Sequence, residues 1–520
     1  MRKHYFLNLV VLLSFTVNAQ VELVKFISSN AKTNSLAATN FGLVFCADDN
    51  PSILNMEPYF SDGSETGTFK LNEINANNVV TNASSVSPTD DTQFIELNGY
   101  VYFAAGSASN NVELWRTDGT TVGTTLVKEI NASTSSSSNP NYITVLNNSI
   151  VFSASNGLSG SNNGTELWIS DGTTAGTVLL KDINPGTASS SPSNFVHLDG
   201  EIFFTADNGT NGRELWKTDG TSSGTVMVKD LVVGASSSNP QYTTVYNGDL
   251  YFRAAGELYK STGVVGNGGV LKNINTSGNS DPIGFKVFNG RLYFSADDGV
   301  NGRELWRTNG TVFGTQLFKD INSGSGNSSP QDFEISNATL FFKATSSSNT
   351  ELWKSDGLAV NTVAITSSNL NPQKLTNYNN KVYFVGPNNR LWVSDGSTSG
   401  TNEVSGTYSN IINVYKMTVF DDELFFGAGN LYKYLDPTLS NDEFVETQSF
   451  KLYPNPTSSY FSICSNMEIK NLEVFDILGK KVKAFTNVRE FYNISDLRNG
   501  IYFIKFNSKN KTQTIKLIKK

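Results

Sequence analysis

The sequence predicts an all-β protein: a large β-propeller of about nine four-stranded blades, with eight to ten as the range, followed by a small Ig-like β-sandwich. Three observations lead to this prediction. The 520 residues include only 17% charged residues and are rich in Gly and other turn-forming types. An aromatic phrase recurs along most of the chain, and the last 74 residues lack it and carry their own strand pattern.

The first element is an export signal, expected over residues 1–19. Arg2 and Lys3 precede an apolar run at residues 6–15, and residues 17–19 supply the small side chains that signal peptidase requires before Gln20. This run is too short to cross a bilayer, and no later segment approaches the ~20 apolar residues that a spanning helix needs. The mature chain is therefore expected to have no transmembrane helix.

A repeated body follows, expected over residues 20–436. Its phrase reads ELWRTDGTTVGT around Trp115 and ELWKTDGTSSGT around Trp216, and degenerate copies carry Tyr instead of Trp. The aromatic position recurs every 39 to 56 residues, at Tyr59, Trp115, Trp168, Trp216, Tyr259, Trp306, Trp353, Trp392 and Tyr432. We expect these aromatic side chains to fill the space between neighbouring units, because one small sheet cannot bury both of its faces alone.

Each repeat contains four short apolar segments. Around Trp216 they lie at residues 179–183, 195–198, 202–206 and 214–217, separated by Asp-Gly and Asn-Gly turns that are typical of hairpins. Four strands in a unit of this length predict a propeller blade. Residues 21–27 match the first segment of later units, so the first unit is expected to begin there. Two smaller propellers are the alternative to one ring.

The phrase resembles the ELWxxDGT repeat family of exported bacterial proteins. That family has no established catalytic residues, so the resemblance implies no active site.

A different module is expected at residues 447–520, after a linker at 437–446. It carries a balance of +8 charges, against −16 for residues 1–446. Its landmarks are an opening YPNP, a DILGK turn and a late GIY strand, which contribute Tyr453, Pro454, Asn455, Pro456, Asp476, Gly479, Lys480, Gly500 and Tyr502. Together they resemble the C-terminal sorting domain of type IX secretion substrates in Gram-negative bacteria. An adhesive Ig-like domain is the alternative.

The sorting-domain resemblance implies a route and a partner. The route leads through the periplasm and across the outer membrane, and the partner is the type IX secretion machinery. The protein would then be released or anchored to surface lipopolysaccharide.

Composition limits the chemistry of the body. An acidic body is a poor partner for nucleic acid. His197 is the one histidine left after signal removal, and Cys46 and Cys464 lie far apart in the chain. The chain therefore lacks the residues for a catalytic triad and for a metal site built on His or Cys. Glutamates recur once per unit, as a structural role would require. The acids that break the repeat, such as Asp281 and Glu334, lie in units that the sequence does not relate.

The segments at residues 207–212 and 297–302 are rich in side-chain oxygens, and we interpret them as turns. The alternative interpretation is that they bind a structural calcium ion. No other cofactor is expected. The expected function is that of a secreted or cell-surface repeat scaffold for adhesion or binding, with an extracellular glycan or protein as its ligand. The alternatives are a carboxylate-based polysaccharide-active enzyme on a propeller and a structural component of the surface or motility machinery.

Overall fold

The computed structural model describes residues 20–28, 33–48, 56–74, 94–106, 111–131, 136–157, 163–366, 368–404, 411, 413–435, 451–453, 455–464, 470–477, 479–485, 491–508 and 511–520. The chain divides into two compact units, residues 1–437 and 438–520. The expected signal at 1–19 and linker at 437–446 lie outside the described residues. No helix in the described ranges has the length and apolar character that a membrane crossing requires.

The first unit is all-β, and its described part holds nine four-stranded antiparallel sheets. Eight sheets each use four consecutive strands, with two short 3-10 helices, η1 (Ala359–Asn361) and η2 (Pro387–Asn389), in connections. The strands are β2 (Thr33–Ala38), β3 (Leu43–Asp48), β4 (Met56–Ser61), β5 (Phe69–Lys70); β6 (Ile95–Leu97), β7 (Tyr100–Gly106), β8 (Val112–Thr117), β9 (Thr125–Lys128); β10 (Asn141–Leu146), β11 (Ser149–Ser155), β12 (Thr165–Ser170), β13 (Val178–Lys181); β14 (Ser193–Leu198), β15 (Glu201–Asp207), β16 (Arg213–Thr218), β17 (Val226–Lys229); β18 (Gln241–Tyr246), β19 (Asp249–Ala254), β20 (Glu257–Ser261), β21 (Gly269–Lys272); β22 (Ile283–Phe288), β23 (Arg291–Asp297), β24 (Arg303–Thr308), β25 (Gln316–Lys319); β26 (Gln331–Ser336), β27 (Thr339–Ser346), β28 (Asn349–Ser355), β29 (Val363–Ala364); and β30 (Gln373–Tyr378), β31 (Lys381–Val385), β32 (Leu391–Ser394), β33 (Asn402–Glu403).

The ninth sheet combines the two ends of the unit. Its order is β1-β36-β35-β34, formed by β34 (Lys416–Phe420), β35 (Glu423–Ala428), β36 (Asn430–Leu435) and the N-terminal β1 (Gln20–Lys25). Strand β1 pairs antiparallel with β36, for example Val21 with Tyr434. The expectation that this segment begins the first unit is therefore wrong, because the strand completes the last sheet.

The same offset applies to every repeat. Residues 179–183 were expected to open the unit of Trp216, but β13 pairs with β12 and belongs to the sheet of Trp168. The reason is the antiparallel order: each short fourth strand follows the ELW strand through a tight turn and pairs back onto it. A structural unit therefore begins one strand later than the repeat read from the sequence.

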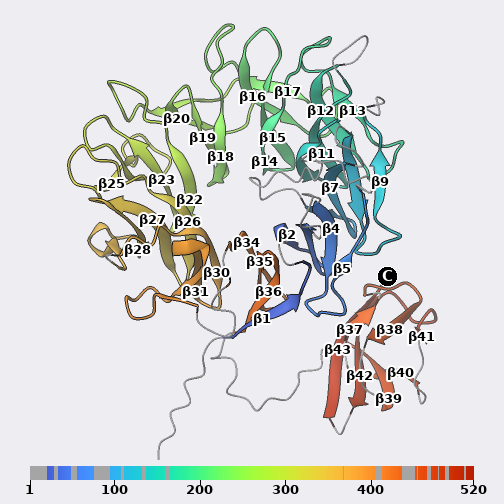
Figure 1. Cartoon of the computed structure of the whole chain (residues 1–520). Coiled ribbons are helices and arrows are strands. Elements are labelled where there is room, and N and C mark those ends of the chain that lie inside the picture. The colour runs from blue at the N-terminus through green and yellow to red at the C-terminus, as the bar shows by residue number, and fades with distance from the viewer. Residues whose placement is uncertain are drawn as a thin grey trace, which may run out of the picture. The chain divides into compact units, whose positions relative to one another are not determined.

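The sheets follow one another in chain order around the unit (Figure 1). Neighbouring sheets pack through their apolar side chains. In one such cluster, Leu146 and Val151 of the β10–β13 sheet join Phe204 and Trp216 of the next sheet. The first strands of adjacent sheets contact one another, as β10 with β14 and β14 with β18. We call these first strands the inner strands.

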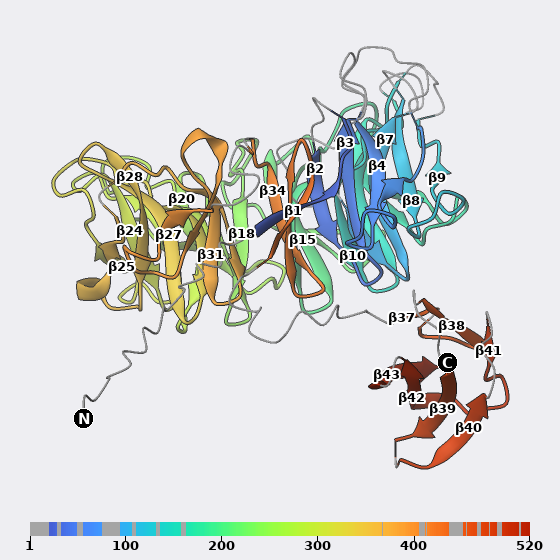
Figure 2. The ribbon, with the colours of Figure 1, turned by 60° about the horizontal axis from the view of Figure 1, so that its bottom comes forward.

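The second unit contains two antiparallel sheets (Figure 2). One has the order β37-β38-β41 and the other β40-β39-β42-β43, from β37 (Lys451–Tyr453), β38 (Tyr460–Cys464), β39 (Lys470–Asp476), β40 (Lys481–Phe485), β41 (Tyr492–Asn493), β42 (Gly500–Ser508) and β43 (Lys511–Lys519). Phe461, Val474, Ile504 and Leu517 are fully buried in a core of its own, so this unit has the apolar interior of a separate domain.

Candidate functional site

A buried glutamate recurs at the start of the third strand in successive sheets. Glu166 Oε2 accepts hydrogen bonds from the Ile183 amide at 2.8 Å and the Ser190 hydroxyl at 2.5 Å, and its Oε1 accepts one from the Ser190 amide at 2.6 Å. Both partners lie on the segment that leads to the next sheet. The same three contacts form at Glu113, Glu214 and Glu304. These glutamates fasten the connections between sheets.

The buried glutamates predict a pH-dependent stability. Burial raises the pKa of Glu166 from 4.5 to about 7, against the opposing effect of its Ser190 hydrogen bonds. Between these values the folded chain holds a proton that the unfolded chain has lost, so this group's contribution to stability falls as pH rises from about 4.5 to 7. In urea unfolding at pH 5 and pH 7.5, Glu166→Gln is expected to show a smaller loss over this interval than the wild type. The exposed Glu65→Gln is the control, and an equal loss in Glu166→Gln and the wild type would contradict the assignment.

The repeated aromatic residues lie in the third strand of their sheets, each opposite a phenylalanine of the second strand, as Trp216 opposite Phe204. Trp115 and Trp392 are partly buried, and the others are at most 8% exposed: Tyr59, Trp168, Trp216, Tyr259, Trp306, Trp353 and Tyr432. None of the nine side chains is presented to solvent as a ligand-binding platform would be.

The DGT turn that follows each ELW strand joins neighbouring sheets. Asp171 Oδ1 accepts hydrogen bonds from the Thr173 amide at 2.8 Å and hydroxyl at 2.7 Å, and these bonds hold the pKa of Asp171 below its ordinary value. Lys128, from the preceding sheet, donates to the carbonyls of Thr174 at 3.3 Å and Thr177 at 2.7 Å. The turn oxygens are thus engaged in holding two sheets together.

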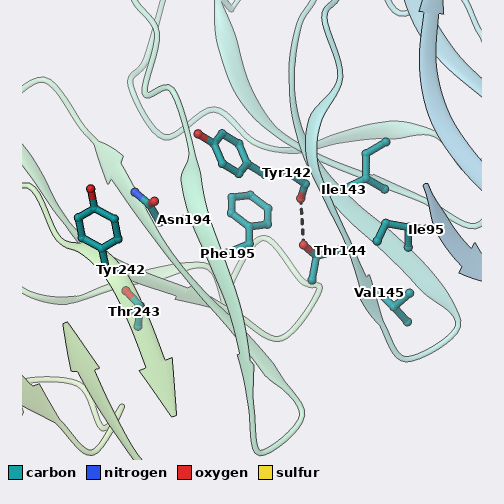
Figure 3. Close-up of a pocket in the computed structure, with 9 residues that line it drawn as sticks. All are labelled: Ile95, Tyr142, Ile143, Thr144, Val145, Asn194, Phe195, Tyr242 and Thr243. Carbon is teal, nitrogen blue, oxygen red and sulfur yellow. Dashed lines mark hydrogen bonds between the residues drawn. The ribbon is translucent and has the colours of Figure 1, made fainter. Parts of the chain in front are cut away.

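A hollow of about 690 Å³ lies over the inner strands β6, β10, β14 and β18 (Figure 3). This volume falls within the range of small-molecule sites. The rings of Tyr142 and Phe195 stack with their centroids 5.9 Å apart and their planes 21° apart. Asn194 lies between Tyr142 and Tyr242, and Thr243 adds a hydroxyl. The hollow therefore offers aromatic faces and the aliphatic side chains of Ile95, Ile143 and Val145, with a few neutral hydrogen-bonding groups.

The charged groups near the hollow lie outside its lining. Arg213 acts electrostatically on Tyr142, and Arg303 on Tyr242. The Arg253 guanidinium lies 5.2 Å from the ring centroid of Tyr242, whose side chain is 49% exposed. Arg253 also forms an ion pair with Asp281 at 3.6 Å and donates to the Gln241 side chain. The nine lining residues include no Asp, Glu, Lys, Arg or His. The lining itself is therefore uncharged.

The remaining reactive side chains do not converge on the hollow. His197 is exposed on β14, and burial raises the pKa of the Cys46 thiol, which disfavours the reactive thiolate. The side chain of Cys464 lies outside the described part. Within the described ranges, no group of three or more His, Cys, Asp or Glu could hold a metal ion.

The two acids that break the repeat are closer in the fold than the sequence indicates. Asp281 precedes β22 and Glu334 lies on β26, and these two strands contact each other. The expectation that they belong to unrelated units is wrong, because their sheets are neighbours. Each acid has a basic partner: Arg253 for Asp281, and Lys286 at 3.1 Å for Glu334.

The oxygen-rich turns use their carboxylates locally. Asp298 Oδ1 accepts hydrogen bonds from the amides of Val300 at 2.9 Å and Asn301 at 2.7 Å, and its Oδ2 accepts one from Asn301 Nδ2 at 2.7 Å. Asp207 Oδ1 likewise accepts one from the Gly209 amide at 2.7 Å. Turn geometry accounts for these residue types.

In the second unit, the predicted landmark residues form turns and strand ends. Asn455, beside Pro456, joins the opening segment to the last strand: its Nδ2 donates to the Lys516 carbonyl and its Oδ1 accepts from the Ile518 amide, each at 2.9 Å. The side chain of Tyr453 and all of Pro454 lie outside the described part.

The central landmark is the turn between β39 and β40. Asp476 Oδ1 accepts from the Lys480 amide at 2.9 Å, and Gly479 adopts a φ of +78°, which favours glycine. Gly500 begins β42, and the Tyr502 hydroxyl donates to the Arg498 carbonyl at 2.7 Å.

Sequence reasoning missed the hollow, although a signal for it is present. A proline stands two residues before a variable residue in six inner strands, at Pro140, Pro192, Pro240, Pro282, Pro330 and Pro372. Three of those variable residues, Tyr142, Asn194 and Tyr242, line the hollow. The repeat around this position is constant, whereas the residue itself differs from unit to unit. Its identity therefore serves a purpose other than forming the repeated sheet.

Residues 451–520 match the model of the secretion system C-terminal sorting domain family. This is the type IX sorting tail, so the protein is secreted to the cell surface or extracellular space and interacts with the secretion machinery. A Gram-negative cell is implied. The search of curated proteins found no match.

Among solved structures, the chain is similar to the computationally designed Ika8 protein, with 15% identity, a TM-score of 0.40, and coverage of 66% of this chain and 95% of the other. It is also similar to PorZ, a surface component of the type IX secretion system of Porphyromonas gingivalis, with 12% identity, a TM-score of 0.37, and coverage of 93% and 70%. A prolyl endopeptidase gives 11% identity, a TM-score of 0.39, and coverage of 94% and 55%. At these scores the likenesses carry no functional argument.

Proposed function

We propose that the protein is a secreted binding scaffold without catalytic activity. A signal peptide (1–19) and the sorting domain (447–520) would direct its export, and the repeat body (20–436) would bind an extracellular glycan or protein. The observation that carries this proposal is the hollow over β6, β10, β14 and β18, which joins aromatic and aliphatic faces to neutral polar groups and has no Asp, Glu, Lys, Arg or His in its lining. The recurring glutamates, turns and aromatics are engaged in the frame.

The body is proposed to be one closed nine-bladed propeller. Three observations at the junction of the last and first sheets support closure. Strand β1 completes the last sheet. Val24 and Phe425 of that sheet share an apolar cluster with Tyr59 of the first sheet. Lys25 donates to the Glu65 carbonyl in the first sheet's turn at 3.3 Å, the contact that Lys128 makes between sheets inside the body.

Closure by a terminal strand fits the physics of a propeller. In a closed ring every blade has a neighbour on each side, so no sheet face is left exposed. A last blade built from strands of both ends of the body keeps the first and last blades together. Two separate propellers would instead need a break in the contacts between inner strands, and these run from β6 through β34 and on to β2.

The proposed function is tested with the purified mature chain on an array of bacterial, plant and animal polysaccharides and extracellular proteins. Saturable binding to at least one of them is expected, with no cleavage product by mass spectrometry. Failure to bind any of them would overturn the scaffold proposal. Turnover that is lost when Asp281 or Glu334 is changed to its amide would show instead that the protein is an enzyme.

A further inference from the structure

Each of seven inner strands contains a β-bulge at the same place. In β10, the register passes from Asn141 opposite Ser153 to Thr144 opposite Val151, so two residues oppose one. The first bulged residue has a φ between +52° and +69° in every case: Ser35, Tyr142, Asn194, Tyr242, Gly284, Asp332 and Lys374. The backbone is constant and the side chain differs from strand to strand.

We propose that these bulge residues are the ligand-contacting positions of the body, and that those at Tyr142, Asn194 and Tyr242 form a site for a neutral polysaccharide. This inference rests on the binding function proposed above and names its site and its ligand class. In seven of the nine sheets one residue is presented from the same backbone conformation, so ligand specificity can change by substitution without altering the fold.

Backbone strain is the first argument. A bulge whose first residue has a left-handed conformation normally places glycine there, because that conformation crowds any Cβ atom. Of the seven positions only Gly284 follows this preference, and Tyr142 (φ +54°) and Tyr242 (φ +56°) are bulky residues that rarely adopt it. Strain kept at equivalent positions is typical of functional sites, where the side chain is needed for something other than folding.

Location is the second argument. Tyr142, Asn194 and Tyr242 come from three successive inner strands and line one hollow (Figure 3). Tyr242 is half exposed although its backbone is strained. Burial of its ring in the core therefore does not explain why tyrosine stands there.

Chemistry selects the ligand class. A sugar ring has an apolar C–H face and a rim of neutral hydroxyls, and the hollow matches both with its stacked Tyr142–Phe195 pair and with the amide and hydroxyl groups of Asn194 and Thr243. A charged polymer would need charged groups in the lining, and none of the nine lining residues is charged. Three sites in a row along adjacent strands fit a chain of sugars better than a single unit.

The test measures binding of the purified mature chain to four neutral hexasaccharides: cello-, xylo-, manno- and maltohexaose. An oligogalacturonate serves as the anionic probe and a polyproline peptide as the peptide probe. We expect binding to at least one neutral hexasaccharide. Tyr242→Gly is expected to weaken that binding about tenfold or more, since it removes a ring contact, while Tyr242→Phe stays close to the wild type.

Stability separates a ligand-binding role from a structural one. Tyr242→Gly relieves the left-handed strain, so its melting temperature is expected to equal or exceed that of the wild type despite the loss of binding. The matched control is Asn247→Gly, which relieves a left-handed φ of +51° in the hairpin turn between β18 and β19, outside the bulges, and is expected to leave binding unchanged.

Three results would overturn the inference. Unchanged binding by Tyr242→Gly would remove the site, and weakened binding together with a lowered melting temperature would make Tyr242 structural. Wild-type binding to the anionic or peptide probe alone would overturn the ligand class and leave the scaffold function standing. The scaffold function itself fails only if the broad array also shows no binding.

Discussion

Replacing Trp216 with alanine is expected to lower the free energy of unfolding of the body by about 3–5 kcal/mol. The side chain is 6% exposed and packs with Leu146 and Val151 of the preceding sheet. Its removal therefore opens a cavity between two packed sheets, where neither sheet can close the gap without moving the other. Urea denaturation of the purified mature chain, followed by tryptophan-independent circular dichroism, measures the change.

A conservative variant separates packing from hydrogen bonding. Trp216 Nε1 is buried and has no hydrogen-bond partner among the described residues, so its polar group contributes nothing that a replacement must supply. Tyrosine holds the equivalent position at Tyr59, Tyr259 and Tyr432, and Trp216→Tyr is expected to cost less than about 1.5 kcal/mol. Unchanged melting in Trp216→Ala would contradict the packing role.

The same substitution at the ring closure tests the closed propeller. Tyr59 lies in a cluster with Val24 and Leu431 of the last sheet. If the ring is closed, Tyr59→Ala costs as much as Trp216→Ala, because both positions separate packed blades. A neutral Tyr59→Ala would mean that the last sheet does not cover the first.

The four-stranded sheets could be predicted because each strand carries a local signal. Alternating apolar residues and Asp-Gly or Asn-Gly turns mark strands and hairpins within a few residues, as at Asp199 (φ +51°) and Gly200 (φ +81°). Sheet membership is not local, and the assignment of β1 and of β13 to units was wrong for that reason. A repeat has the same period whichever strand is counted first. The sequence therefore does not show which strand is the first of each sheet.

The candidate site was hidden for a related reason. Repetition directs attention to residues that recur, such as Glu166 and Trp216, and these are the residues that the frame requires. The residues of the hollow recur in position and differ in identity, and a bulge that places Tyr142 beside Phe195 of the next sheet is a property of three-dimensional pairing. The alternation of apolar and polar residues that identifies a strand does not reveal such a bulge.

Removal of residues 447–520 is expected to abolish appearance of the protein outside the cell and to leave the body in the periplasm. These residues include the sorting-domain match at 451–520 and carry a balance of +8 charges. The body is a separate unit that ends at residue 437, so the deletion removes no strand of its nine sheets. Immunoblots of medium, surface-shaved, periplasmic and cytoplasmic fractions measure where the truncated chain lies.

Two controls distinguish a failure of export from a folding defect. The truncated body purified from the periplasm is expected to melt within a few degrees of the same transition in the full chain, because the second unit has its own core around Phe461 and Leu517. Residues 438–520 fused to a periplasmic reporter are expected to carry it out of the cell. Truncated protein outside the cell in normal amount would contradict the prediction. A reporter that stays inside would show that this unit is necessary for export and that the body also contributes to recognition by the machinery.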